Sequence, residues 1–246
     1  MTMEKQVNIA SYLDSTYLKT AAEASISQIE TKEIVINSIK EAIDSKFACI
    51  MIRSEFIAIA KELIETSKSK LKVGTVVDFP LGNSTTEQKI IEAKLAIKSG
   101  AYDIDYVCDY NAFKRGDFGK FDIDIIEGTS LVLENKKIVK WIIETGALSS
   151  DEIRDITKRI SELVQSEFLQ NARRVFIKTS TGYYGGYGAT VKDIKTIKSV
   201  CGNLQIKASG GISCLKDCLE MIKAGATRVG TSKASFLYQE NKKNEF

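Results

Sequence analysis

The chain has 246 residues, 43% of them hydrophobic and 27% charged, so it can bury a core and fold as a globular domain. Its 35 basic and 32 acidic residues are scattered and give a net charge of only +3, which argues against nucleic acid or an anionic membrane as the main partner. No stretch approaches the ~20 apolar residues of a membrane span, and the first residues lack the apolar segment of a secretory signal, so we expect a cytoplasmic protein.

The cysteines indicate a reduced environment. They are odd in number and follow no disulfide framework: Cys49, Cys108, Cys201, Cys214 and Cys218. Cys214 and Cys218 lie four residues apart on a predicted helix and could face a metal together. The chain has no histidine and no second cysteine pair nearby, so we interpret them as half-buried thiols and expect no metal site.

Apolar, β-branched runs alternate with helical patterns along the chain. The predicted strands cover residues 9–14, 47–52, 71–77, 102–108, 138–143, 174–178, 204–207 and 226–230. The first of these cannot be told from a helix end by sequence alone. Residues 85–100 and 213–225 have helical spacing and end on glycine, while helices beginning near Ser149 and Thr190 have capping residues and early acids.

This alternation predicts an α/β fold with a parallel sheet covered by helices. Eight strand–helix units in a chain of this length favour a closed (β/α)8 TIM barrel, typically ~250 residues, over an open doubly wound sheet. No linker or low-complexity tract divides the sequence. We therefore predict one barrel domain over residues 1–246.

Two lysines end short apolar strands, where lysine is unusual. Lys178 ends the run 174–178 and Lys207 ends the run 204–207. Burial without a partner favours the neutral amine, and two nearby amines lower each other's pKa further. The 29 positions between them are about one strand–helix–strand repeat, so adjacent strands can present both amines to one pocket. A neutral lysine is a nucleophile, and the pair predicts Schiff-base chemistry.

Two further charges occupy neighbouring predicted strands. Asp105, Lys140, Lys178 and Lys207 are separated by 35, 38 and 29 residues, each about one repeat, so four consecutive strands would direct charge into one pocket. A buried ion pair that merely ties the barrel together is the structural alternative. Three lysines with one carboxylate exceed what such a pair needs, which favours function, although Lys140 could instead reach solvent.

Glycine-rich loops follow the last three predicted strands. Their backbone N–H groups and the helix N-termini behind them would form an anion site at Gly182, Gly210, Gly211, Gly230, Ser232 and Lys233. Barrels often bind phosphate after the seventh and eighth strands. Tight turns are the alternative for any one loop. The lack of a P-loop, of an early Gly-x-Gly-x-x-Gly and of histidine disfavours ATP, dinucleotides and most zinc chemistry.

Together these residues match a known pattern: the chain resembles the deoxyribose-phosphate aldolase family, class I aldolases on a (β/α)8 barrel. The resemblance runs from about residue 9 to residue 234. It depends on five ordered blocks, Phe-Pro-Leu-Gly at 79–82, Ile-Asp-Tyr-Val at 104–107, Ile-Ile-Glu-Thr at 142–145, Phe-Ile-Lys-Thr-Ser-Thr-Gly at 176–182 and Lys-Ala-Ser-Gly-Gly at 207–211.

The resemblance implies specific roles. Lys178 corresponds to the Schiff-base lysine, Lys207 to the lysine that keeps it deprotonated, and Asp105 to the carboxylate that moves protons through a water. Thr181 and Asp14 fall where the family contacts sugar hydroxyls, and Lys140 falls on an inward-facing lysine. The glycine-rich positions named above fall on the phosphate cradle. No metal or organic cofactor is implied.

Four segments depart from the family pattern. The first motif, 14–20, lacks the usual histidine and proline, and Met51-Ile52-Arg53 stands where many members have Asn-Pro. The loop 183–188 is about one residue longer than usual and holds three tyrosines. Lys233 replaces a common serine, and it either adds charge to the phosphate loop or points into solvent.

We therefore expect an aldolase that cleaves 2-deoxy-D-ribose 5-phosphate reversibly to acetaldehyde and D-glyceraldehyde 3-phosphate. One alternative is a related Schiff-base aldolase for another phosphorylated aldehyde or ketone. Another is a sugar-phosphate-binding barrel without turnover. The expected partner is a small phosphorylated sugar rather than nucleic acid or membrane, and a homo-oligomer is compatible with the sequence.

Overall fold

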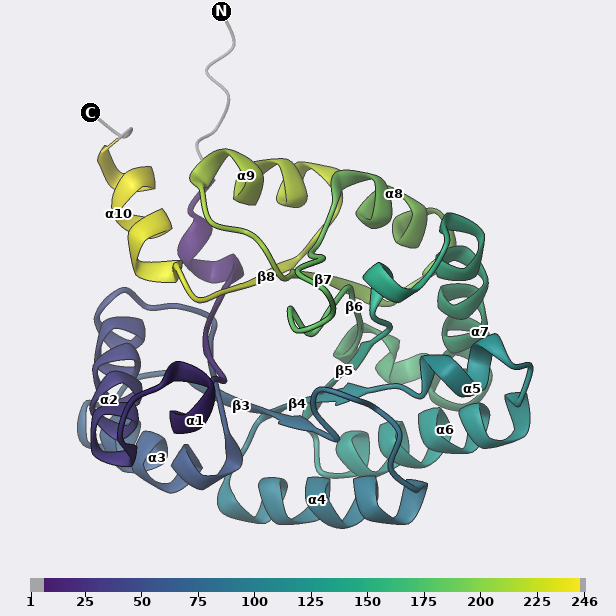
Figure 1. Cartoon of the computed structure of the whole chain (residues 1–246), viewed down its shortest axis with the longest axis horizontal. Coiled ribbons are helices and arrows are strands. Elements are labelled where there is room, and N and C mark those ends of the chain that lie inside the picture. The colour runs from purple at the N-terminus through teal and green to yellow at the C-terminus, as the bar shows by residue number, and fades with distance from the viewer. Residues whose placement is uncertain (1–6, 244–246) are drawn as a thin grey trace, which may run out of the picture.

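The computed structural model describes residues 7–243. In this range eight parallel strands close into a barrel in the order β1 to β8, with β1 paired to β8, and helices surround the sheet (Figure 1). This confirms the predicted (β/α)8 barrel. The N-terminal segment compared with a secretory signal lies outside the described residues at positions 1–6, as do residues 244–246.

The strands overlap the predicted runs, with one correction at the front. They are β1 (Leu13–Tyr17), β2 (Cys49–Ile52), β3 (Lys72–Val77), β4 (Asp103–Val107), β5 (Ile138–Ile142), β6 (Val175–Lys178), β7 (Gln205–Ser209) and β8 (Arg228–Thr231). The predicted strand at 9–14 is mostly a 3-10 helix, η1 (Ile9–Tyr12), because the Asn8 side chain accepts a hydrogen bond from the Ala10 N–H and caps the turn. The strand begins at Leu13.

The α-helices follow the strands in sequence. They are α1 (Ala21–Ala24), α2 (Gln28–Asp44), α3 (Ile57–Thr66), α4 (Thr86–Ser99), α5 (Tyr110–Lys114), α6 (Phe118–Glu134), α7 (Ser150–Phe168), α8 (Val191–Val200), α9 (Leu215–Ala224) and α10 (Ala234–Lys243). Short 3-10 turns occur at η2 (Ser54–Phe56), η3 (Thr145–Ala147) and η4 (Leu169–Arg174). None of the helices in residues 7–243 has the length and apolar character needed to cross a bilayer.

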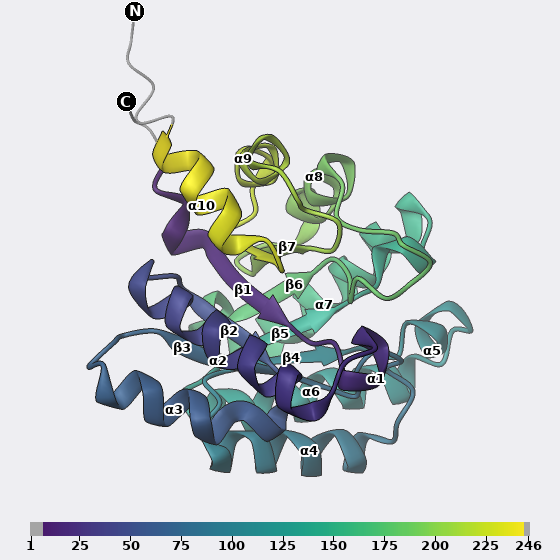
Figure 2. The same cartoon turned by 60° about the vertical axis from the view of Figure 1, so that its left-hand side comes forward.

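Local sequence signals explain where several helices begin and end. Capping boxes at Thr85 and Ser149 start α4 and α7, and Gly100 ends α4 with a φ of 109° that favours glycine. The last helix, α10, packs against β1 and α9 and closes the ring of helices (Figure 2). Its position brings the N-terminus of α10 to the carboxyl end of β8.

The apolar core lies between the sheet and the helices. Tyr106 of β4 and Trp141 of β5 stack there with ring centroids 4.7 Å apart, and Trp141 reaches α6 at Gly128. A Cβ at Gly128 would lie 2.8 Å from the Trp141 ring, so the helix approaches the sheet closely only because this residue is glycine. The barrel interior, in contrast, contains charged side chains.

We predict that Gly128→Ala destabilises the protein although alanine favours helix formation. The added methyl group overpacks the Trp141 ring, at a cost of about 1–3 kcal/mol, which exceeds the ~1 kcal/mol gained from helix propensity. Gly119→Ala in the same helix is the control, because a Cβ there meets nothing within 4 Å. Thermal unfolding should give a lower Tm for Gly128→Ala and an unchanged or higher Tm for Gly119→Ala. Equal Tm values would contradict the close packing.

Candidate active site

The four charged residues predicted to share a pocket lie together inside the barrel. Lys178 Nζ and Lys207 Nζ lie 3.0 and 2.9 Å from the same oxygen, Oδ2 of Asp105. Lys140 Nζ lies 2.8 Å from the other oxygen, Oδ1. The register of β6 and β7 places Lys178 beside Lys207, which explains how both amines reach one carboxylate.

Three more charged residues extend this cluster into a closed ring. Arg228 contacts both Asp14 and Asp103, which in turn contact Lys207 and Lys140. Acid and base alternate around the ring with N···O distances of 2.8 Å (Asp105–Lys140), 2.6 Å (Lys140–Asp103), 2.9 Å (Asp103–Arg228), 2.6 Å (Arg228–Asp14), 2.7 Å (Asp14–Lys207) and 2.9 Å (Lys207–Asp105). We call these six residues the charge ring.

The charge ring is neutral when all six members are ionised, since three carboxylates face three cations. Burial alone would raise the pKa of Asp14 and Asp105 and lower the pKa of Lys140. The attraction between ring partners outweighs this effect. It holds the pKa of both aspartates well below the usual aspartate range and the pKa of Lys140 above the usual lysine value. Asp14, Asp105 and Lys140 therefore stay charged although they are fully buried.

Lys178 contacts the charge ring as a seventh charge. Burial lowers the pKa of Lys178 to about 8; Asp105 opposes this shift, while Lys207 and Lys140 add to it. A protonated Lys178 would leave one uncompensated positive charge in a buried space, which is costly. Lys178 consequently loses its proton more easily than an ordinary lysine.

A cavity of about 950 Å³ opens above this cluster at the carboxyl ends of the strands. Lys178, Lys207 and Thr181 line it. Asp14 and Lys140 are fully buried and are not among its lining residues. The structure therefore places Asp14, predicted to contact a sugar hydroxyl, beneath the cavity between Lys207 and Arg228.

Thr181 is held by a buried acid that the sequence analysis did not single out. The Thr181 hydroxyl and its N–H both donate to Oε2 of Glu144, which is 1% exposed and follows β5 in a left-handed conformation with φ 55°. The Tyr183 N–H donates back to Thr181 Oγ1 at 3.0 Å. Burial raises the pKa of Glu144, against the hydrogen bonds from Thr181. In the sequence, the signal that could have identified Glu144 is a carboxylate directly after a buried strand.

The predicted anion-binding residues all line the same cavity: Gly182, Gly210, Gly211, Gly230, Ser232 and Lys233. Gly182, Gly210 and Gly211 have positive φ values of 82°, 90° and 72°, which turn the backbone in ways that favour glycine. Just beyond Ser232 and Lys233, α10 begins, so its free N–H groups lie beside the cavity.

Gly230 has a second function in the structure. A Cβ at this position would lie 2.9 Å from Lys207 Cε, so the absence of a side chain makes room for the second lysine. Gly230 thus joins the predicted anion-binding loop to the site of the buried lysines.

Three of the segments that depart from the family pattern, 14–20, 51–53 and 183–188, meet at the rim of the barrel. Tyr183 packs edge-on against Phe79 with ring centroids 5.0 Å apart, and the Arg53 guanidinium lies 5.2 Å from the Phe79 centroid. Arg53 Nε also donates to the Leu18 carbonyl at 2.8 Å. The changes in these three segments therefore belong to one structural unit at the cavity mouth.

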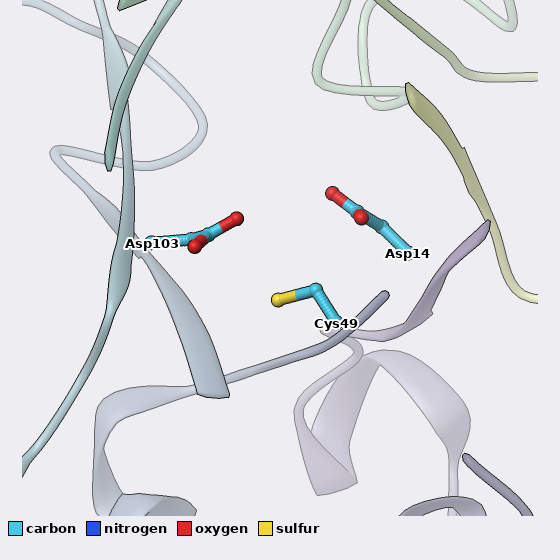
Figure 3. A group of neighbouring side chains, drawn as sticks. All are labelled: Asp14, Cys49 and Asp103. Carbon is cyan, nitrogen blue, oxygen red and sulfur yellow. The ribbon is translucent and has the colours of Figure 1, made fainter. Parts of the chain in front are cut away.

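Asp14, Cys49 and Asp103 come close enough to resemble a metal site. Their ligand atoms lie within 4.8 Å of one another, and Figure 3 shows the two carboxylates pointing toward each other with Cys49 beside them. However, Arg228 bridges the two carboxylates, and burial raises the pKa of the Cys49 thiol well above its usual value. Asp14 and Asp103 belong to the charge ring, whose cations already neutralise both acids. Cys214, the other metal candidate, caps the start of α9.

Comparison with known proteins identifies the family, although no family model matches the chain. Deoxyribose-phosphate aldolase from Thermococcus gammatolerans is 37% identical over 227 residues, covering 92% of this chain and 93% of that protein. The Staphylococcus saprophyticus enzyme of the same name is 40% identical with the same coverage. The tetrameric deoxyribose phosphate aldolase from Aeropyrum pernix has a TM-score of 0.78 at 26% identity, over 95% of this chain and 91% of that chain. This chain belongs to the deoxyribose-phosphate aldolase family.

Proposed function

We propose that the protein cleaves 2-deoxy-D-ribose 5-phosphate reversibly to acetaldehyde and D-glyceraldehyde 3-phosphate, with Lys178 as the Schiff-base nucleophile. The observation that carries the proposal is the contact of Lys178 with a neutral charge ring while it lines the cavity. At pH 7 an amine whose pKa is about 8 is neutral in about one molecule in ten, far more often than an ordinary lysine, and only the neutral amine can attack the aldehyde.

The reaction follows from the positions of the two amines and the shared carboxylate. Neutral Lys178 Nζ attacks the C1 aldehyde to give a carbinolamine, which loses water to form an iminium ion. The C3 hydroxyl then gives up its proton, the C2–C3 bond breaks, and its electrons move to the iminium to form an enamine, releasing glyceraldehyde 3-phosphate. Protonation of the enamine at C2 and hydrolysis release acetaldehyde and restore Lys178.

Asp105 is placed to move protons in these steps, because its Oδ2 contacts both amines. A water between this carboxylate and the substrate would carry the proton. Lys207 favours the neutral form of Lys178 through its positive charge. Asp14 and Lys140 would act through Lys207 and Asp105 rather than by touching the sugar, since both are buried beneath the cavity.

The remaining cavity residues would orient the substrate. The phosphate would bind at the glycine loops and the N-terminus of α10, with Lys233 adding a charge nearby. The Thr181 hydrogen is donated to Glu144, so its oxygen would act as an acceptor toward a substrate hydroxyl.

Two alternatives remain open to test. The rim formed by Arg53, Phe79 and Tyr183 could adapt the site to another phosphorylated aldehyde or ketone. A binding protein without turnover would keep the phosphate site but form no covalent adduct. Activity on deoxyribose 5-phosphate with and without chelator distinguishes these cases from the proposed enzyme.

We also propose a cytoplasmic location, one domain over residues 1–246 and assembly into a homo-oligomer. Four of the five cysteines are buried as free thiols, which supports a reducing compartment. The closed barrel spans β1 to β8 without an inserted unit in the described range, which supports one domain. The tetrameric relative from Aeropyrum pernix supports an oligomer.

The covalent intermediate gives the first test of the function. Acetaldehyde and cyanoborohydride should label Lys178, and the labelling rate should rise with pH through about 8 and level off above it, because only the neutral amine reacts. Peptide mass spectrometry locates the label, and Lys178→Arg is the control. Labelling mainly at Lys207 or Lys140 would overturn the assignment.

Glu144 should matter for its hydrogen bonds rather than for its charge. The amide oxygen of Glu144→Gln can still accept from Thr181, so kcat/KM should stay within a few-fold of wild type. Glu144→Leu leaves the Thr181 hydroxyl without its acceptor, at about 1–3 kcal/mol, and should lower kcat/KM about 10–100-fold. Because the two residues act as a unit, adding Thr181→Val to Glu144→Leu should cost little more. Independent, additive losses would contradict this coupling.

Lys233 should strengthen phosphate binding modestly. An exposed charge contributes about 0.2–1 kcal/mol, so Lys233→Ser should raise KM for deoxyribose 5-phosphate a few-fold and leave kcat nearly unchanged. Unphosphorylated deoxyribose is the internal control and should respond little. Equal KM values for the two proteins at low salt, where screening is weakest, would mean that Lys233 only points into solvent.

A further inference from the structure

Asp103 and Arg228 are buried charges for which the proposed reaction has no direct use. Neither residue lines the cavity, and the ion pairs of Lys178 do not include them. Their side chains are 0% and 14% exposed. Two paired charges in a barrel interior that is usually filled by branched apolar side chains require an explanation.

The contacts of these two residues define what they hold in place. Arg228 Nε donates to Asp14 Oδ1 at 2.6 Å, and its terminal nitrogen donates to Asp103 Oδ2 at 2.9 Å. Asp103 in turn accepts from Lys140 at 2.6 Å. Asp103 and Arg228 thus close the charge ring on the side away from Lys178, and they fix the outer partners of Lys140 and Asp14.

Charged side chains face the barrel interior from β1, β4, β5, β7 and β8. Asp103 and Asp105 face the interior from β4, Lys140 from β5, Lys207 from β7, Arg228 from β8 and Asp14 from β1, and Glu144 follows β5. From β2, Cys49 contributes a thiol that burial keeps neutral. The charges of the six ring members sum to zero, so removal of one charge leaves the ring that contacts Lys178 with a net charge.

We propose that Asp103 and Arg228 are positioning residues that control the protonation of Lys178 by keeping the charge ring closed and neutral. This inference rests on the proposed role of Lys178 as the nucleophile. Neither residue contacts the substrate, yet for each of them the proposal predicts the direction in which its removal shifts the pKa of Lys178.

The signs are opposite because the two residues carry opposite charges. Asp103→Asn leaves the ring with a net charge of +1, which disfavours the ammonium and lowers the pKa of Lys178. Arg228→Gln leaves a net charge of −1 and raises it. Because one unit charge in the ring is left unbalanced, we expect a shift of about half a unit to one unit, or about 3–10-fold in the neutral fraction below the pKa. The double variant restores neutrality and should return the pKa close to the wild-type value.

The experiment measures Lys178 itself, so that it does not depend on turnover. Competitive acetylation of lysines as a function of pH, read by peptide mass spectrometry, gives the pKa of Lys178 in wild type, both single variants and the double variant. Glu127→Gln on α6 and Lys98→Gln on α4 are matched controls, since both residues are exposed and their variants change the net charge by the same amounts. The controls should leave the pKa of Lys178 unchanged.

Opposite shifts in the two single variants, cancelled in the double variant, are the expected result. Shifts of the same sign, or lower stability without any shift, would show that the pair only supports the barrel and would overturn the proposal. If one single variant does not fold, the other and the double variant carry the same comparison. If neither folds, the double variant carries the test: a pKa of Lys178 close to the wild-type value supports the proposal, and a shifted pKa or an unfolded protein overturns it. If Lys178 shows the expected acetylation behaviour but the protein has no aldolase activity, the proposed function is contradicted and the inference about Asp103 and Arg228 is not.

Discussion

The arrangement of the site depends on one constraint, the need to balance charge inside a barrel that water barely reaches. Asp105 shares its two oxygens among three lysines, and the other members of the charge ring compensate each other. With six charges balanced, a further cation is disfavoured, and that cation is the Lys178 ammonium. Burial beside the balanced ring thereby lowers the pKa of the amine at the cavity floor to about 8.

The fold supplies this arrangement through strand register. β6 and β7 align Lys178 with Lys207, and β4 and β5 align Asp105 with Lys140, and the three lysines meet at the Asp105 carboxylate. The main apolar core lies at the sheet–helix interface, where Tyr106 and Trp141 stack. The glycine loops after the last strands then place backbone donors above the amines.

Sequence reasoning could predict the barrel and the four central charges because both leave local signals. Charged residues within apolar runs revealed Lys178 and Lys207. The same signal existed for Asp103, which lies two positions before Asp105 on the same face of β4, and for Arg228 in β8. However, these two residues pair with each other across 125 residues of sequence, and no local pattern encodes that pairing. Glu144 was missed for the same reason, since its partner Thr181 lies on another loop. At the front, a capping Asn8 replaced the expected strand by a 3-10 turn.

The account is tested most directly by the protonation state of the nucleophile in the free enzyme. An NMR titration of lysine side chains labelled with 13C at Cε, with Lys178→Arg used to assign the signal, gives this value without substrate. The account predicts one lysine resonance that titrates at about 8 and is absent from the variant. A Lys178 resonance that titrates at or above the ordinary lysine value of about 10.4 would contradict the claim that burial beside a charge-balanced ring lowers the pKa of Lys178.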